Sequence, residues 1–407
     1  MKKAIIILSG LLLSVNVFSQ SRINNGFWRA VLERRDGKQI VFNIRSATEK
    51  GNTVLYVKNA SEEMRLSDVT FHGDSVFFNM PVFESGFRAK IVSPDSLNGF
   101  WIRASVSRNI VLPFTATQKN PKRFALTNGN AHSNLSGKWA ISFGANSEPA
   151  IGNFIQHQNK ITGSVLTPTG DDRYLEGVVS GDSVRLSGFD GIHALLYVAK
   201  INGKNLDGTL YSGAASKEKF TAVFNDTATL PNTSAMYVKK GENGHLHFRF
   251  KDLNGNDVSI NDERFENKVV VIDIMGSWCP NCMDETAFLS DFYNKQKEKN
   301  VEIIGLCYEL TTDFERSKNS IEKFKKRFNV QYPLLITGVS VAEPEPARTE
   351  KTLPQLTSIK MFPTTIILDK TGKVRKIDTG FEGPATGEYY MKYVQEFNET
   401  IDTLLKE

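Results

Sequence analysis

The pattern of apolar and polar positions changes about half-way along the chain. From about residue 24 to residue 226, short runs in which apolar and polar residues alternate are separated by Gly, Asn and Asp. Examples are KQIVFNI, NTVLYVKN, DSVFFNM, NKITGSVL, DSVRLSGF and KFTAVFN. A period of two is typical of strands that bury one face. We therefore predict antiparallel β-structure with little helix for this region.

Short matches within the β region indicate two copies of one module. Five pairs of similar segments occur in the same order, and each second member follows the first by 106 to 111 residues. They are GFW and GKW, GDSV twice, AKI twice, LNG and LDG, and FTA twice. We predict two tandem all-β modules at residues 24–120 and 130–226, each a small barrel or sandwich of six to eight strands.

A different pattern follows the polar linker predicted at 227–241. KVVVIDIM and VEIIGLCYEL are almost continuously apolar, as expected of strands covered on both faces. Helical spacing is found in PNCMDETAFLSDFYNKQKEK and DFERSKNSIEKFKKRF, and a hairpin and an amphipathic helix end the chain. Residues 242–407 are therefore predicted to be an α/β domain with a mixed sheet.

The first 19 residues are predicted to be a secretory signal peptide. Lys2 and Lys3 precede an apolar run from Ala4 to Phe18, which is too short for the ~20 residues of a spanning helix. No cysteine follows this run to carry a lipid, so we expect a soluble protein of the periplasm. The formal net charge of the 407 residues is +5, without a dense basic tract, which argues against nucleic acid and acidic membranes as partners.

The chain has three cysteines, Cys279, Cys282 and Cys307. Secreted domains that depend on disulfides usually carry several, and a bridge across two residues adds little to a large core. A zinc site needs further Cys or His ligands at suitable spacing, and none is found. We predict no metal and no other cofactor. Cys307 lies within an apolar strand and is predicted to be an inert core thiol.

The remaining interpretation of Cys279 and Cys282 is a redox-active pair. The pair follows a buried strand directly and begins a helix, whose first position suits Pro280. Backbone N–H groups and the helix dipole at this end stabilise a thiolate on Cys279, which makes it the attacking sulfur. Cys282, one helical turn further, can then resolve a mixed disulfide.

Two acidic residues accompany the pair. Glu285 shares a helical stripe with Cys282, and Asp273 interrupts the apolar run VVVIDIM. A carboxyl beside a buried thiol is expected to have a raised pKa and to exchange the proton of Cys282. Two alternatives stay open: Glu285 as an acid favoured in the first turn of a helix, and Asp273 as a hydrogen-bonded structural acid.

With KVVVIDIMGSWCPNC, Glu285, VEIIGLCYE and FPTTIILDKTGKV in this order, residues 242–407 resemble the TlpA/ResA-like branch of exported thioredoxin-fold proteins. The resemblance implies that Cys279 is the nucleophile and Cys282 the resolving thiol, and that Glu285 is the active-site glutamate. Asp273 departs from the asparagine frequent in that branch.

The resemblance also implies where a substrate binds. Trp278 would flank the disulfide, Pro363 would be a cis-proline facing it, and the backbone of Phe362 would hold an extended substrate strand. We therefore expect Trp278, Pro280, Phe362 and Pro363 to contact the substrate. The long stretch before Pro363 is expected to form an extra strand and an acidic loop near the site. TGFEGPATGEYY, before the last helix, is either a structural cap or a loop that lines the site.

The predicted function is that of an exported thiol–disulfide oxidoreductase that reduces disulfides of periplasmic proteins. Its partners would be these substrates and a membrane-embedded thiol electron donor. One alternative is an oxidase or isomerase that uses the same residues. A peroxiredoxin would want threonine where Gly276 stands. The non-enzymatic alternative is a binding or assembly protein in which the β modules act and the thioredoxin domain is accessory.

Overall fold

The computed structural model describes residues 23–144, 148–231, 236–296 and 300–407. The predicted signal peptide lies outside the described residues. No helix in the described ranges has the length and apolar character needed to cross a membrane.

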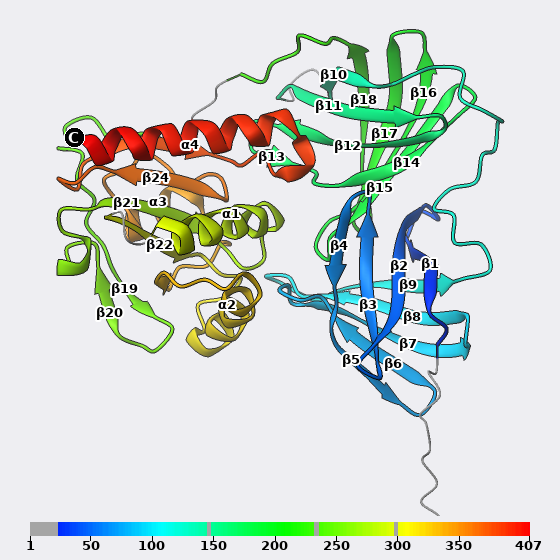
Figure 1. Ribbon diagram of the computed structural model, residues 1–407, viewed down its shortest axis with the longest axis horizontal. Coiled ribbons are helices and arrows are strands. Elements are labelled where there is room, and N and C mark those ends of the chain that lie inside the picture. The colour runs from blue at the N-terminus through cyan, green and yellow to red at the C-terminus, as the bar shows by residue number, and fades with distance from the viewer. Residues whose placement is uncertain (1–22, 145–147, 232–235, 297–299) are drawn as a thin grey trace, which may run out of the picture.

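The first sheet of the described chain is antiparallel. Its strands follow the order β4-β3-β2-β1-β9-β8-β7-β6-β5 (Figure 1). In β9 buried and exposed positions alternate, as the sequence pattern predicts. The nine strands are β1 (Gly26–Glu33), β2 (Gln39–Glu49), β3 (Asn52–Asn59), β4 (Glu62–Arg65), β5 (Ser67–His72), β6 (Ser75–Asn79), β7 (Ser85–Ser93), β8 (Ser96–Arg103) and β9 (Ile110–Thr117).

The second sheet has the order β11-β10-β18-β17-β16-β15-β14-β12-β13. An additional pairing of β11 with β12 closes it into a barrel, and β13 lies beside β12 outside the closed ring. The nine strands are β10 (Gly137–Ser142), β11 (Ala150–His157), β12 (Lys160–Thr167), β13 (Gly170–Asp171), β14 (Leu175–Ser180), β15 (Ser183–Phe189), β16 (Ala194–Asn202), β17 (Asn205–Ser212) and β18 (Ser216–Phe224).

The N-terminal part of the described chain is thus all-β, with barrel-like sheets. Each sheet has nine strands, more than the six to eight expected. The difference comes from very short strands such as β4 and β13, in which too few residues alternate for a pattern to be visible.

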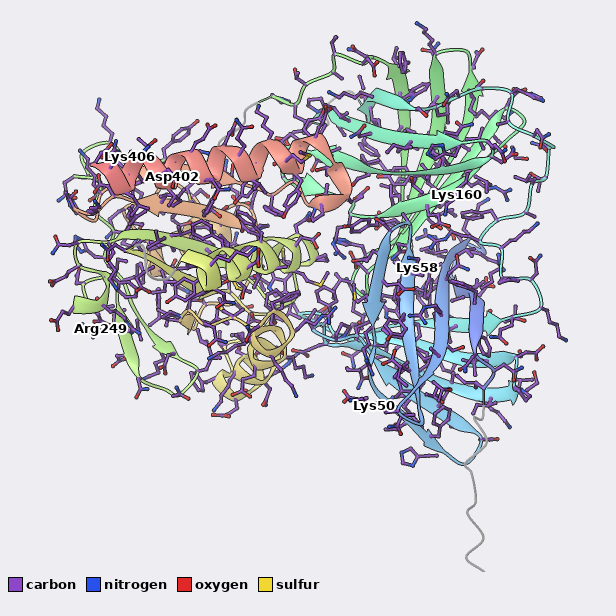
Figure 2. All side chains as sticks on the ribbon, in the orientation of Figure 1. Lys50, Lys58, Lys160, Arg249, Asp402 and Lys406 are labelled. Carbon is purple, nitrogen blue, oxygen red and sulfur yellow. A yellow bond between two sulfur atoms is a disulfide. The ribbon has the colours of Figure 1, made fainter. Side chains whose placement is uncertain are left out.

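The two sheets meet at a buried arginine. Arg123, in the segment that connects them, is 5% exposed and donates to the carbonyl oxygens of Lys58 (2.6 Å) and Ser187 (2.9 Å). It also donates to Asn43 Oδ1 at 3.2 Å. Figure 2 labels Lys58 of the first sheet and Lys160 of the second on either side of this junction. One guanidinium therefore ties together strands of both sheets.

The C-terminal part is an α/β domain around a seven-stranded mixed sheet. The strand order is β20-β19-β23-β22-β21-β24-β25, in which β22 is parallel to both β21 and β23. The strands are β19 (Arg249–Asp252), β20 (Asp257–Ser259), β21 (Val269–Met275), β22 (Val301–Cys307), β23 (Leu334–Ile336), β24 (Thr364–Leu368) and β25 (Val374–Thr379). The helices are η1 (Glu263–Phe265), α1 (Pro280–Gln296), α2 (Phe314–Phe328), α3 (Glu345–Thr352), η2 (Pro384–Thr386) and α4 (Glu388–Lys406).

Strand β21 is the centre of this domain, and all seven of its residues are buried. Val269 and Val271 belong to one apolar cluster with residues of α1, α2 and α4, whereas Val270 and Ile272 belong to another with Leu353, after α3. Layers on both faces explain the almost continuous apolar run that predicted this strand. The sequence predicted α1, α2 and α4 but not α3, because EPARTEKT is polar and lacks apolar periodicity.

Replacement of Arg123 tests the junction between the sheets. Arg123→Met should lower the stability of the protein by about 2–4 kcal/mol, because it leaves buried acceptors without donors. The thermal midpoint measures the loss. Lys122→Met, at the exposed neighbouring position, is the control. Equal midpoints for Arg123→Met and the wild type would show that the junction does not depend on the guanidinium.

Candidate functional site

The two cysteines lie where β21 leads into α1. They form a disulfide with a Cα–Cα distance of 5.2 Å. Cys282 is fully buried and Cys279 is 3% exposed, so Cys279 is the more accessible sulfur. The backbone N–H of Cys282 donates to Sγ of Cys279 at 3.2 Å. This contact and the helix N-terminus favour negative charge on Cys279 when the pair is reduced.

The predicted substrate contacts surround the disulfide, except that Pro280 begins α1 and is buried. The Phe362–Pro363 peptide is cis, and the carbonyl oxygen of Phe362 lies 3.5 Å from Sγ of Cys279. The rings of Trp278 and Phe362 meet edge to face at 5.5 Å between centroids. Pro363 is buried behind them. Their contact with a substrate stays a prediction.

Gly276 leaves room for the indole of Trp278. Trp278 Nε1 donates to the carbonyl oxygen of Tyr308 at 2.7 Å. A Cβ on Gly276 would lie 2.2 Å from Nε1 and 2.8 Å from that oxygen. A threonine therefore does not fit at residue 276 with the indole in this position.

Asp273 and Glu285 form a buried acid pair beside α1. Asp273 is 0% and Glu285 1% exposed. Both carboxylate oxygens of Asp273 and Oε2 of Glu285 lack a donor among the described residues, so nothing but a proton of their own can offset the cost of burying them. Burial raises the pKa of Glu285 to about 7, and burial and the charge of Glu285 raise the pKa of Asp273 well above its usual value. Glu285 lies one helical turn after Cys282, and its exchange of that thiol's proton stays a prediction.

Two donors that orient Glu285 were missed from the sequence. Thr365 Oγ1 donates to Glu285 Oε1 at 2.6 Å, and the hydroxyl of Tyr393 donates to the same oxygen at 2.7 Å. They come from β24 and α4, about 80 and 108 residues away, and no local pattern links them to Glu285. They hold the carboxyl in one orientation.

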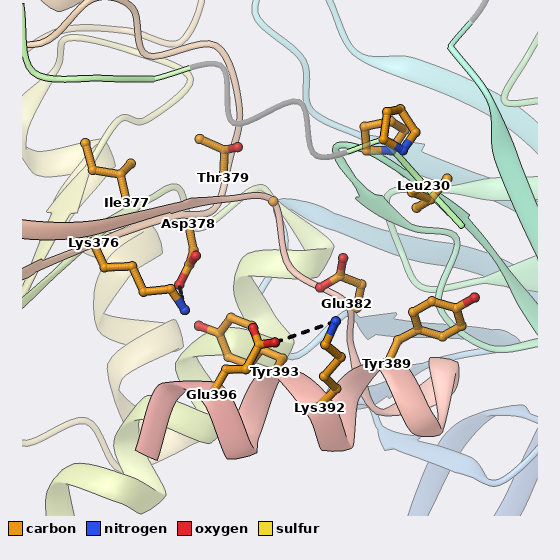
Figure 3. A pocket seen from close by; sticks show the side chains of 13 residues that line it. Leu230, Lys376, Ile377, Asp378, Thr379, Glu382, Tyr389, Lys392, Tyr393 and Glu396 are labelled. Carbon is orange, nitrogen blue, oxygen red and sulfur yellow. Dashed lines mark ion pairs between the residues drawn. The ribbon is translucent and has the colours of Figure 1, made fainter. Parts of the chain in front are cut away.

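Tyr393 also borders a cavity of about 360 Å³. Figure 3 shows Asp378, Lys376, Lys392 and Glu396 around it, contributed by β25 and α4. Tyr393 thus contacts both Glu285 of the buried acid pair and the charged side chains that line this cavity.

Two further contacts of the site were not foreseen. Glu309, after β22, accepts from the backbone N–H (2.9 Å) and hydroxyl (2.6 Å) of Ser277, and burial raises its pKa to about 7. Asn281, between the two cysteines, donates to Asp171 of β13 at 3.2 Å. The β region therefore touches the redox motif directly.

Comparisons with known proteins place these features in a family. The family model described as Redoxin matches residues 229–390. The thiol-disulfide oxidoreductase ResA of Bacillus cereus is 27% identical over 186 residues, which are 46% of this chain and 86% of that protein. ResA of Bacillus thuringiensis subsp. konkukian is 28% identical over 148 residues, 36% of this chain and 75% of that protein. These matches cover the C-terminal part.

Among solved structures, a thiol-disulfide oxidoreductase from Bacteroides fragilis is similar to part of the chain. It has a TM-score of 0.28 and 22% sequence identity, and the similarity covers 37% of this chain and 96% of that one.

The buried acid pair should make stability depend on pH. A carboxyl whose pKa is higher in the folded than in the unfolded protein lowers the stability of the fold when it ionises. For Glu285 this loss should develop as the pH rises from the ordinary pKa of 4.5 through the folded pKa of about 7. Glu285→Gln cannot ionise, so above pH 7 it should be more stable than the wild type, by up to about 3 kcal/mol. The gain should vanish towards pH 4.

Thermal midpoints between pH 4 and pH 8 measure this difference. Glu399→Gln, at an exposed position on α4, is the matched control and should show no gain in stability that depends on pH in this way. A Glu285→Gln protein that is less stable than the wild type at pH 8 would contradict the ionisation cost.

Proposed function

Because residues 229–390 are a Redoxin domain and the C-terminal part of the chain is a thioredoxin-like thiol–disulfide oxidoreductase, we propose that this protein is exported and reduces disulfides of periplasmic proteins. The observation that carries the proposal is the Cys279–Cys282 disulfide at the N-terminus of α1, with the acid pair of Asp273 and Glu285 beneath it. We further propose that its electrons come from a membrane-embedded thiol donor.

The reaction begins from the reduced pair. The Cys279 thiolate attacks one sulfur of a substrate disulfide, a mixed disulfide forms, and the other substrate sulfur leaves as a thiolate. Cys282 gives its proton to the acid pair and attacks Sγ of Cys279, which releases the second substrate sulfur. Two electrons pass to the substrate, and the enzyme is left with the disulfide seen here. A dithiol donor then restores the reduced pair by the same two exchanges in reverse.

Glu285 and Asp273 would act in the second exchange. Cys282 is fully buried, so its proton needs an acceptor inside the protein. Glu285, with a pKa raised by burial to about 7, can accept a proton near neutral pH and return it in the reductive half-reaction. Thr365 and Tyr393 would keep its Oε1 oriented during both transfers.

The charges near the pair support reduction rather than oxidation. A strong oxidant needs a strongly stabilised thiolate. The first two turns of α1, PNCMDET, contain two acids, both in the second turn, and no cation, and the nearby cation Arg173 is paired with Asp284 and Glu62. The helix N-terminus therefore stabilises the thiolate of Cys279 without help from a cation of these turns or from Arg173. The Gly276 position also argues against peroxiredoxin chemistry.

For the β region, we propose that residues 24–120 and 130–226 are two copies of one module. Every strand of the first sheet has a counterpart nine strands later in the second. The two strand orders correspond when the second is followed through the β11–β12 pairing, and the β12–β14 pairing that closes its ring has no counterpart in the first sheet. This correspondence supports the repeat seen in the sequence. The alternative function is that of a binding or assembly protein, in which the β modules act and the oxidoreductase domain is accessory.

The reduction potential tests the direction of electron flow. At pH 7 the Cys279/Cys282 pair should equilibrate at about −250 mV or below, as expected of a reductase. Equilibration with dithiol buffers, followed by mass analysis of alkylated thiols, gives the value. A potential of about −120 mV would reverse the proposal in favour of an oxidase.

A trapping variant identifies the substrates. Cys282→Ala cannot resolve the mixed disulfide, so substrate proteins should remain bound to Cys279 and be released by reductant. The variant lacking both thiols, Cys279→Ala/Cys282→Ala, is the control and should retain none. Absence of protein adducts from the periplasm of the producing cells would argue against protein disulfides as substrates.

A further inference from the structure

The turn around β13 belongs to the β region but lies against the redox site. Figure 1 shows β13 beside the start of α4, at the edge of the barrel where it pairs with β12. A Cβ on Gly170 would come within 3.2 Å of Oδ1 of Asn281, and one on Gly380 within 3.0 Å of the backbone of Thr169. The turn is therefore in close contact both with the CxxC motif and with the loop before α4.

Asp171 is the residue of this turn that reaches the motif. Its Oδ2 accepts from Nδ2 of Asn281 at 3.2 Å and from the N–H of Gly383 at 2.7 Å. Its Oδ1 accepts from the N–H of Arg173 at 2.6 Å and from Oγ of Ser164 at 3.1 Å. The carboxyl is 6% exposed, so four donors hold it in one place.

An ion cluster connects the β13 turn with the second turn of α1. Arg173 Nε and Nη2 each donate to the carboxylate of Asp284 at 2.8 Å, and Nη2 also reaches Glu62 at 2.7 Å. The three side chains are 3%, 11% and 12% exposed. Since one cation faces Asp284, Glu62 and Asp171, the cluster carries excess negative charge when these acids are ionised.

This arrangement brings a buried carboxylate of the β region to the residue between the two cysteines. Negative charge near the N-terminus of α1 opposes the stabilisation that the helix gives to a thiolate there. Nδ2 of Asn281 donates to both the carbonyl oxygen and Oδ2 of Asp171 at 3.2 Å. These hydrogen bonds direct the amide towards Asp171 and not towards Sγ of Cys279. Both effects disfavour the thiolate form of Cys279.

We propose that Asp171 is a positioning residue of the redox site: acting through Asn281, it disfavours the Cys279 thiolate and makes the Cys279/Cys282 pair more reducing. The proposal deepens the proposed function and rests on Cys279 being the attacking thiol. It gives the β region a chemical role in the reaction, since the residue that tunes the pair lies about 110 positions before it.

Asp171→Asn in the full-length protein tests this role. The variant removes the charge and keeps an oxygen acceptor for Asn281. The pKa of Cys279 should fall by about 0.5–1 unit. The equilibrium with a dithiol should shift towards the reduced enzyme by about threefold to tenfold, about 15–30 mV. The pH dependence of alkylation of reduced enzyme, and equilibration in dithiol buffers, measure the two quantities.

The equilibration with dithiol should be made at about pH 8, where Asp171 is charged, and the alkylation series should include this pH. Burial raises the pKa of Asp171 to about 7, Asp284 on α1 raises it further, and Arg173 lowers it. Further acids near the turn are Asp172, Asp190, Glu62 on β4 and Glu382 in the loop before α4.

The matched control is Asp182→Asn. Asp182 is on the same barrel with its side chain 72% exposed, and its replacement should change neither the pKa of Cys279 nor the equilibrium. If Asp171→Asn lowers only the thermal midpoint, and leaves the pKa and the equilibrium at wild-type values, Asp171 is a structural residue and the proposal is wrong.

A double-mutant cycle tests the path through Asn281. In an Asn281→Ala background, Asp171→Asn should shift the pKa of Cys279 by less than half as much as in the wild type. An undiminished shift would overturn the role of Asn281. The outcome is separate from the direction of electron flow: a wild-type potential typical of an oxidase would reject the proposed reductase, and the shift caused by Asp171→Asn would still be measurable.

Discussion

The junction at which the buried strand β21 becomes helix α1 is the constraint on which the functional structure depends. The strand is buried at every position, so its end is fixed within the domain, and the first N–H groups of the helix point at a defined place. Cys279 occupies that place, with Cys282 one turn along the helix. The acid pair lies on β21 and α1 themselves, and the cis peptide before Pro363 and the β13 turn approach the same junction from two other parts of the chain. Each can influence the sulfur chemistry only because the junction does not move.

This construction includes groups that cost stability. Two carboxyl groups without a cation, Asp273 and Glu285, lie in the interior, where ionisation is penalised. An apolar pair of similar volume would pack there at no such cost. Acids at this place are understandable if protons must enter and leave the site, because Cys282 is fully buried and cannot exchange its proton with solvent directly. Thr365 and Tyr393 limit the cost by satisfying one carboxylate oxygen of Glu285.

How much of this was visible in the sequence follows from the range of each interaction. The spacing of Cys279, Cys282 and Glu285 on one helix is local, and so is the interruption of an apolar strand by Asp273; these predicted the pair and its acids. The strands of the β region were predicted by alternation, but β4 and β13 are too short for it. Helix α3 has no apolar face to detect. Tyr393 and Asp171 reach the site only through the tertiary fold, and neither has a distinctive sequence context.

The contacts between the β region and the Redoxin domain are spread over both sheets. Glu84 of the first accepts from Arg316 Nη2 at 2.8 Å and from the hydroxyl of Ser320 at 2.9 Å, both on α2. The second sheet contributes Asn153, which donates to the carbonyl oxygen of Thr386 at 3.1 Å, in addition to the β13 turn. A single-point attachment would allow the domain to swing about it, whereas contacts on α1, α2 and η2 fix its orientation. The β region is therefore built to hold a particular face of the oxidoreductase, the one that contains the disulfide. The β region therefore contacts the CxxC helix from outside its own domain, and under the proposed role of Asp171 the same contacts that fix this helix also act on the redox pair.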